Sequence, residues 1–301
     1  MSALTELAPA KINLGLSLGP PRADGRHELA TVMQPVGLCD RVRLAPAPLG
    51  AARDEVHCPG VDGDNLALAA LAAFRERTGW DGAPVRIEID KRIPVAAGMA
   101  GGSADAGAVL RLAARAAGRR ELLRDERALR EIAAGLGADV PAQVRPRRYL
   151  ATGAGEELHA LPDVAPFGIL VVRSPQRLAT GDVFREADRL GLPRTASQLE
   201  AHRAELVAAL AAGASMPPGE LLANDLEPAA VSLLPELADT IEDVRRMGAQ
   251  HAMVCGSGPT VVGLFTDLER ARGAGVALSG RVPAPIAVEP WYESIAPLEE
   301  A

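Results

Sequence analysis

Cysteine is scarce in this sequence, and its three copies are scattered. Cys39, Cys58 and Cys255 form no Cys-x-x-Cys pair, and no pair of the five histidines has metal-ligand spacing. An odd, dispersed set of cysteines argues against a disulfide framework and against a zinc site, and it is typical of a reducing compartment. We therefore predict a cytoplasmic protein that holds no metal through a cluster of its own side chains.

Long apolar runs and excess positive charge are also absent. No stretch approaches the length of a membrane-spanning helix, and the N-terminus reaches Glu6 and Lys11 without the apolar core of a signal peptide. The formal net charge is -7, so we expect no broad surface for nucleic acid or for an anionic membrane. At 301 residues, the chain is long enough for two domains.

Lysine is almost missing from the sequence. Of the 32 basic residues only two, Lys11 and Lys91, are lysines, and the others are arginines. A lysine retained in such a background favours a place where a compact ammonium is needed and a planar guanidinium does not fit. The alternative is that these two lysines survive by chance.

Residues 94–105 form a small-residue loop between a predicted strand and a predicted helix. The alternating run 85–89 is typical of a strand, and the Ala/Leu-rich run to about residue 117 is typical of a helix. A helix N-terminus offers free backbone N–H groups and a favourable dipole to an anion, and glycine lets the backbone approach closely. We interpret the loop as a triphosphate cradle, the alternative being an ordinary strand–turn–helix corner. Its residues are Pro94, Val95, Ala96, Ala97, Gly98, Met99, Ala100, Gly101, Gly102, Ser103, Ala104 and Asp105.

The spacing of this loop excludes other phosphate-binding motifs. There is no Gly-x-x-x-x-Gly-Lys-Ser/Thr sequence, and neither lysine follows a glycine. The loop glycines do not fit Gly-x-Gly-x-x-Gly, and the signatures of protein kinases are absent. Ser103 can cap the helix, or place its hydroxyl on a metal ion or a phosphate.

Three other positions combine local structure with possible chemistry. Residues 4–18 predict a half-buried strand, on which Lys11, Asn13 and Gly15 share one face. Asn65 stands before an apolar helical run and is interpreted first as an N-cap, with a ligand role second. Asp139 lies in a turn before a proline, where local context favours a capping aspartate.

The remaining pattern predicts a second half built from strands and helices. A turn-rich loop is expected at 20–29, a strand over 30–44, a helix near 125–135, a hairpin with its tip at 152–156 and a linker at 158–166. Beyond the linker we predict strands at 167–172, 252–255, 260–265 and 282–289, and helices near 180–190, 197–212, 229–247 and 267–278. This order suggests a split βαβ layer.

Four motifs in order give the chain a resemblance to a known family. They are Pro-Ala-Lys-Ile-Asn-Leu-Gly-Leu at 9–16, the loop at 94–105, Gly-Ala-Asp-Val-Pro at 137–141 and Gly-Ser-Gly-Pro-Thr at 256–260. Together they resemble the GHMP kinase superfamily. Asp-Gly-x-His-Glu-Leu at 24–29 and Ile-Asp-Lys-x-Ile-Pro at 89–94 are similar to the branch that phosphorylates a cytidine-diphosphate sugar alcohol for isoprenoid biosynthesis.

The resemblance implies an α+β fold with two domains and an active site in the cleft between them. Residues 1–160 would form the GHMP N-terminal ATP-binding domain, and residues 161–301 a ferredoxin-like C-terminal domain. The implied reaction is ATP-dependent phosphorylation of the 2-hydroxyl of a methylerythritol unit, with Mg²⁺. The expected partner is this small molecule, with neither nucleic acid nor membrane, and the expected state is a monomer or weak homodimer.

The resemblance also implies roles for individual residues. Lys11 and Asp139 match catalytic positions, and residues 94–104 match the ATP-binding loop, in which Ser103 could contact Mg²⁺. Further positions are implied by the same resemblance: Asn65 and Lys91 near the adenine, Asn13 and His27 on the substrate with His27 facing cytosine, and Thr180 and Phe184 in the substrate wall.

The sequence departs from the family pattern at three places. Arg26 stands where the family usually has a tyrosine, and a guanidinium can also stack on a base or pair with a diphosphate. Ala97 and Ala100 replace two loop glycines, so we predict negative φ at both.

Two alternatives to the implied function stay open. They are a kinase for another small alcohol, such as mevalonate or homoserine, and a non-catalytic sensor of the same fold.

Overall fold

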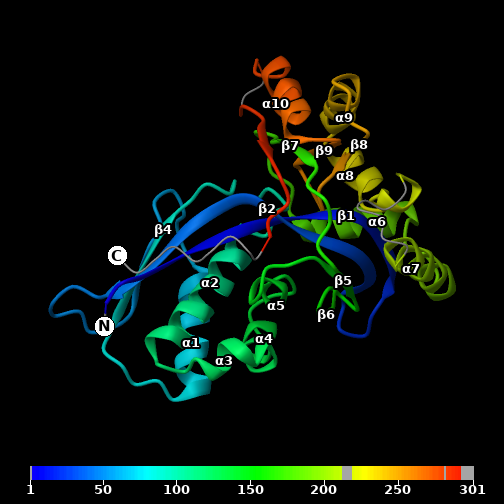
Figure 1. Cartoon of the computed structure of the whole chain (residues 1–301). Helices are drawn as coiled ribbons and strands as arrows, with labels where there is room; N and C mark the ends of the chain where they lie inside the picture. The colour runs from blue at the N-terminus through cyan, green and yellow to red at the C-terminus, as the bar shows by residue number, and fades with distance from the viewer. Residues whose placement is uncertain (1, 212–218, 281–282, 293–301) are drawn as a thin grey trace.

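The computed structural model describes residues 2–211, 219–280 and 283–292, in which the strands form two sheets (Figure 1). The first sheet has the order β3-β4-β2-β5-β6, and β1 pairs with β2 beside this path. Its strands are β1 (Leu4–Pro21), β2 (His27–Pro46), β3 (Glu55–His57), β4 (Val85–Asp90), β5 (Tyr149–Thr152) and β6 (Glu157–Ala160).

The long antiparallel pair β1 and β2 crosses the view from one side to the other (Figure 1). Register shifts between Pro9 and Ala10, and again between Leu14 and Leu16, interrupt its ladder. The connecting turn is confined to residues 22–26, which is shorter than the predicted loop, because both strands continue into the second half. Residues 8–19 of β1 are all buried, so this part of the predicted half-buried strand is covered on both faces.

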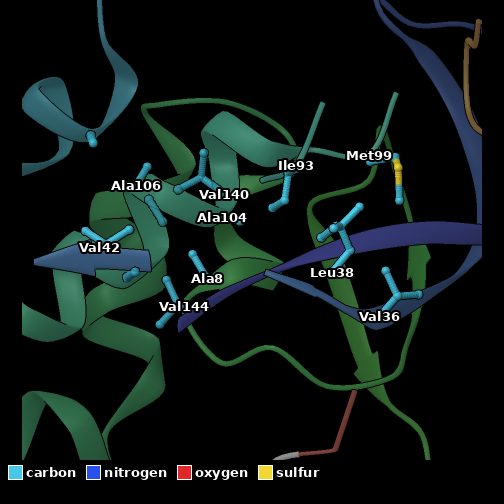
Figure 2. Close-up of a cluster of buried hydrophobic side chains, with 14 of the residues drawn as sticks. Ala8, Val36, Leu38, Val42, Ile93, Met99, Ala104, Ala106, Val140 and Val144 are labelled. Carbon is cyan, nitrogen blue, oxygen red and sulfur yellow. The ribbon is translucent and has the colours of Figure 1, made fainter. Parts of the chain in front are cut away.

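Five helices lie together on one side of the first sheet (Figure 1). They are α1 (Leu66–Thr78), α2 (Gly101–Ala116), α3 (Glu121–Arg124), α4 (Glu126–Ala134) and α5 (Val140–Gln143). Figure 2 shows how side chains from β1, β2, α2 and α5 converge in the core, among them Ala8, Val42, Ala106 and Val140. Burial of these apolar groups is the main stabilising contribution of this half.

The second sheet has the order β10-β7-β9-β8 and is antiparallel throughout. Its strands are β7 (Gly168–Val172), β8 (His251–Val254), β9 (Val261–Phe265) and β10 (Ile286–Val288). The helices of this half are α6 (Thr180–Leu190), α7 (Ala196–Ala211), α8 (Glu227–Leu233), α9 (Glu236–Arg246) and α10 (Leu268–Ala277), with a 3₁₀ turn at Gly219–Leu222. The order strand–helices–strand–strand–helix–strand agrees with the predicted split βαβ layer.

Two local predictions differ from the structure, and one strand was missed. The predicted helix over 229–247 is two helices, which are separated at Pro235. A proline has no backbone N–H for the helical hydrogen bond, so a single helix does not continue through this position. Residues 157–160 pair with β5, so the predicted linker begins as a strand. The short strand β3 was not predicted. The predicted end of the helix near 197–212 and the predicted start of the strand at 282–289 lie outside the described residues.

A search of the described part of the chain finds no helix that combines the length and the apolar character needed to cross a membrane.

Helix α2 packs on α5 at a position where only glycine fits. A Cβ built at Gly107 would lie 2.3 Å from the carbonyl oxygen of Gln143, whereas a Cβ at Gly102, in the same helix, meets nothing within 4 Å. We expect Gly107→Ala to lower the free energy of unfolding by about 3 kcal/mol through overpacking. Gly102→Ala should cause no loss, since alanine favours the helix. Chemical denaturation of both variants measures this, and equal stability of the two would contradict it.

Candidate active site

Lys11 and Asp139, the two predicted catalytic residues, face each other across an ion pair. Lys11 lies on β1 and Asp139 just before α5, and Lys11 Nζ is 3.6 Å from Asp139 Oδ2. The Asp139 side chain is 33% exposed, so it remains open to a ligand. Although Asp139 is the N-cap residue of α5, its side chain makes no capping hydrogen bond. The local capping interpretation is therefore wrong, because the carboxylate turns to the ammonium of a distant strand.

A chain of hydrogen bonds orients the Lys11 ammonium. Lys11 Nζ donates to Asn13 Oδ1 at 2.8 Å, and Asn13 Nδ2 donates to Thr31 Oγ1 at 2.9 Å. Thr31 Oγ1 in turn donates to the carbonyl oxygen of Gly15 at 2.6 Å. Because an ammonium can only donate, the Asn13 amide turns its oxygen to Lys11 and its Nδ2 to Thr31. Thr31 was not predicted from the sequence, which carries no local signal for it.

The first cavity, of about 630 Å³, collects residues from both halves of the chain. It contains the predicted catalytic and substrate residues Lys11, Asn13, Arg26, His27, Asp139, Thr180 and Phe184. Gly256 and Ser257, from the turn between β8 and β9, also contribute to its wall, and Ser257 Oγ lies 3.1 Å from Thr180 Oγ1. The residues that the sequence assigned to chemistry and to substrate are thus brought into one cavity.

His27 is a buried part of this wall and not the exposed loop residue that is usual for a histidine in such a turn. It is 6% exposed, and its Nε2 lies 2.8 Å from Asp188 Oδ1. The ring of Phe184 lies beside it, with centroids 5.4 Å apart. His27 comes from β2 whereas Phe184 and Asp188 come from α6. Asp188 was missed, although its position four residues after Phe184 puts it on the same helical face.

Arg26 lies at the exposed side of the first cavity. Its Nε and Nη2 donate to Asp24 Oδ2 at 3.0 and 2.8 Å. These hydrogen bonds lower the pKa of Asp24 below its usual range. Because the guanidinium side chain is 49% exposed, a ligand can still reach it.

The second cavity, of about 310 Å³, is lined by the predicted phosphate loop. Of the predicted ATP residues it contains Asn65, Lys91, Pro94, Val95, Ala96, Ala97, Gly98, Ala100, Gly101 and Gly102. The two cavities share Gly98 and Ala100, so they meet at the loop.

Three predicted ATP residues line neither cavity: Met99, Ser103 and Ala104. The Met99 side chain is buried beside Ile93 and Leu38 (Figure 2), and its carbonyl oxygen accepts the backbone N–H of Lys11 at 3.1 Å. Helix α2 has no side-chain cap, so Ser103 does not act as one. The contact of Ser103 with Mg²⁺ stays a prediction.

Two alanines of the loop have left-handed backbone conformations. Ala96 has φ 57° and Ala100 has φ 56°, whereas Ala97 is outside this region. The prediction of negative φ is therefore wrong at Ala100. The loop turns sharply because Gly98 packs on the β8–β9 turn, where a Cβ would lie 2.6 Å from the Cys255 carbonyl oxygen. A left-handed alanine costs about 1–2 kcal/mol.

Ionic and polar side chains surround the second cavity. Lys91 Nζ donates to Asp105 Oδ2 at 2.8 Å and also bonds Asp40. Burial raises the pKa of Asp105 to about 7, and burial likewise raises that of the Cys58 thiol. Asn65 Oδ1 accepts the N–H of Ala67 at 2.9 Å, which confirms the N-cap interpretation. Among the described residues no group of three or more His, Cys, Asp or Glu could hold a metal ion.

Comparisons with known proteins identify the family. The family model for the N-terminal domain of GHMP kinases matches residues 65–146, and the model for the C-terminal domain matches residues 198–283. A relative from Leifsonia xyli, named 4-diphosphocytidyl-2-C-methyl-D-erythritol kinase, is 39% identical and the match covers 93% of each chain. One of the same name from Streptomyces coelicolor is 43% identical, with 89% of this chain and 90% of that one covered.

A solved structure is also similar to the whole chain. The crystal structure of a 4-(cytidine 5'-diphospho)-2C-methyl-D-erythritol kinase matches with a TM-score of 0.74 and 34% identity. The match covers 96% of this chain and 99% of that one.

The strain at Ala100 leads to a stability prediction. We expect Ala100→Gly to raise the free energy of unfolding by up to about 1 kcal/mol, because glycine adopts this φ freely but loses more entropy on folding. Ala97→Gly is the matched control in the same loop, and it should destabilise because it has no strain to relieve. Thermal unfolding of both variants measures the difference. A loss at Ala100→Gly equal to that at Ala97→Gly would refute the left-handed conformation.

Proposed function

This chain belongs to the GHMP kinase family, and we propose that it uses ATP to phosphorylate the 2-hydroxyl of 4-diphosphocytidyl-2-C-methyl-D-erythritol in isoprenoid precursor biosynthesis. It is a small-molecule kinase, since relatives at 36–43% identity over most of its length carry the name of that kinase. The observation that supports the mechanism best is the Lys11–Asp139 ion pair in the wall of the first cavity, to which both halves of the chain contribute.

Asp139 would act on the substrate hydroxyl. Phosphoryl transfer proceeds through a loose transition state, so positioning and charge neutralisation contribute most of the rate. The nucleophile is a tertiary alcohol, which is a poor acid. A carboxylate is a weak base at equilibrium, but it can orient this hydroxyl and take its proton late, when the oxygen has become more acidic.

Lys11 would stabilise both the base and the transferring group. The ammonium lies 3.6 Å from the Asp139 carboxylate, so it would hold that carboxylate in position. Because the ammonium has three donors and Asn13 takes one, another remains for an oxygen of the phosphoryl group. The Thr31 and Asn13 hydrogen bonds would hold the ammonium in place during the reaction.

ATP would lie in the second cavity with its terminal phosphate at Gly98 and Ala100, where the cavities meet. The loop 94–104 would surround the phosphates, whereas Asn65 and Lys91 would lie near the base. Mg²⁺ binds nucleotides mainly through phosphate oxygens and keeps several waters, so it fits a site without a cluster of acidic ligands. When bound, it would neutralise charge on the phosphates.

The cytidine-diphosphate part of the substrate would lie in the first cavity. His27 and Phe184 offer a ring surface for the planar cytosine, and Asp188 orients the imidazole. Arg26 would pair with the diphosphate or stack on the base, and Asn13 and Thr180 would contact the sugar alcohol.

The finer assignments are part of the same proposal. We assign residues 1–160 to the ATP-binding domain and residues 161–301 to the C-terminal domain. We also propose that the protein works in the cytoplasm as a monomer or weak homodimer, with neither nucleic acid nor membrane as a partner.

Removal of the Asp139 carboxylate tests the mechanism. We expect Asp139→Asn to lower kcat on the order of a hundredfold or more, while the affinity for ATP changes little. Lys11→Met should behave similarly. Asp125→Asn is the matched control, because Asp125 also lies at a helix N-cap but lines neither cavity. Steady-state kinetics of ATP consumption measure these effects. Full activity of Asp139→Asn would remove this residue from the mechanism.

Substrate identity is tested at Phe184. We expect Phe184→Ala to raise KM for the cytidine-diphosphate substrate roughly tenfold, since a base stacked on an aromatic ring gains about 1–3 kcal/mol. The KM for ATP should not change. Leu190→Ala, at the exposed end of the same helix, is the control.

Other alcohols test the alternative kinase with wild-type protein. Mevalonate and homoserine should be poor substrates, and a kcat/KM for either that is higher than that for the cytidine-diphosphate substrate would favour the alternative.

A further inference from the structure

Asp40, Lys91 and Asp105 form a buried ionic cluster beneath the phosphate loop, which we call the loop clamp. Their side chains are 0%, 13% and 6% exposed, respectively. They come from three segments: β2, the residues just after β4, and α2. One ammonium thus connects two carboxylates that are far apart in the sequence.

We propose that Asp40 and Asp105 are positioning residues that act through Lys91 to hold the loop 94–100 in its phosphate-binding shape. This inference rests on the proposed function, because it takes the second cavity to be the ATP site. Lys91 and Asp105 line the second cavity, whereas Asp40 lines neither cavity, so any effect of Asp40 on ATP must be transmitted through its neighbours.

Asp40 holds the chain where it enters the loop. Its Oδ1 accepts the backbone N–H groups of Arg92 and Ile93 at 2.5 and 2.8 Å. These two residues lie between the end of β4 and Pro94, the first loop residue. The carboxylate therefore determines the direction in which the chain leaves the strand.

Asp105 holds the chain where it leaves the loop. It lies in α2, which begins at Gly101, and it receives the Lys91 ammonium at 2.8 Å. The helix approaches the clamp closely, because a Cβ at Gly101 would be 3.3 Å from Lys91 Nζ and 2.9 Å from Ile93 Cγ2. The two ends of the loop are thus connected through a single side chain.

The loop requires such restraint because it contains two alanines at unfavourable backbone angles. Left-handed φ at Ala96 and Ala100 persists only where the surrounding structure imposes it. If the clamp is loosened, the loop relaxes and the fraction of molecules competent to bind triphosphate falls. The apparent dissociation constant then rises by the inverse of that fraction.

The chemistry of the clamp accounts for the lysine at this position. A compact ammonium with three donors fits between two nearly buried carboxylates, whereas a planar guanidinium needs more room. Two donors of Lys91 are already used, by Asp40 and Asp105. Its main contribution is therefore to the shape of the loop.

The experiment compares clamp variants with a matched ion pair elsewhere in the same half. The clamp variants are Asp40→Asn and Asp105→Asn. The control is Asp54→Asn, because Asp54 Oδ1 also accepts a backbone N–H, that of Val85, and its carboxylate pairs with Arg75, but it lines neither cavity. Calorimetric titration with ATP, without the alcohol, gives the dissociation constant, and kinetics give KM for each substrate.

We expect both clamp variants to bind ATP about tenfold more weakly, which corresponds to a competent fraction of about one in ten. The KM for the alcohol should stay within about twofold of wild type, and Asp54→Asn should bind ATP like wild type at reduced stability. Asp40→Asn tests transmission through the clamp, because Asp105 itself lines the second cavity. If Asp40→Asn does not fold, unchanged ATP affinity in Asp105→Asn still overturns the clamp.

The outcomes separate the two proposals. Absence of ATP binding by the wild-type protein would overturn the proposed function. Normal binding by wild type together with unchanged affinity in Asp105→Asn would overturn the clamp alone. The clamp would also be overturned if Asp54→Asn weakened ATP binding equally, or if KM for the alcohol rose as much as KM for ATP.

Discussion

The close packing of α2 between β1 and α5 is the constraint on which the site depends. Helix α2 begins at the phosphate loop, and its contact with α5 at Gly107 leaves no room for a side chain. This contact sets the position of α5 and of Asp139 just before it. On the other side of the helix, β1 carries Lys11, whose backbone N–H is bound by the loop at Met99. One helix therefore relates the ammonium, the carboxylate and the loop to one another.

The acidic groups around the loop differ in their surroundings, and the differences match their roles. The side chain of Asp139 is partly exposed and forms an ion pair with Lys11, which suits the role proposed for it at the substrate hydroxyl. Asp40 is fully buried and saturated by two backbone N–H groups and an ammonium. A buried carboxylate with this many donors is stable only as part of the scaffold. The two carboxylates thus differ in exposure and in the number of donors that they receive.

Much of the site could be predicted from the sequence, because its main signals are local. The alternation along β1 puts Lys11 and Asn13 on one face, and the structure joins them by a hydrogen bond. Small residues before an Ala/Leu-rich helix predict a phosphate loop, and in the structure this loop lines a cavity. The backbone angle of Ala100 was predicted wrongly, because the close packing of the loop on the β8–β9 turn overrides the preference of alanine.

The sequence by itself determined the strongly patterned strands and helices, the loop and the residue types suited to phosphoryl transfer, since periodicity and motif spacing are properties of short segments. Only the tertiary structure decided which side chains meet: Asp139 with Lys11 and not with its own helix, His27 with Asp188 from the other half, and Lys91 with two carboxylates. Such pairings join segments that are distant along the chain. Their geometry follows from how sheets and helices pack, which no local pattern records.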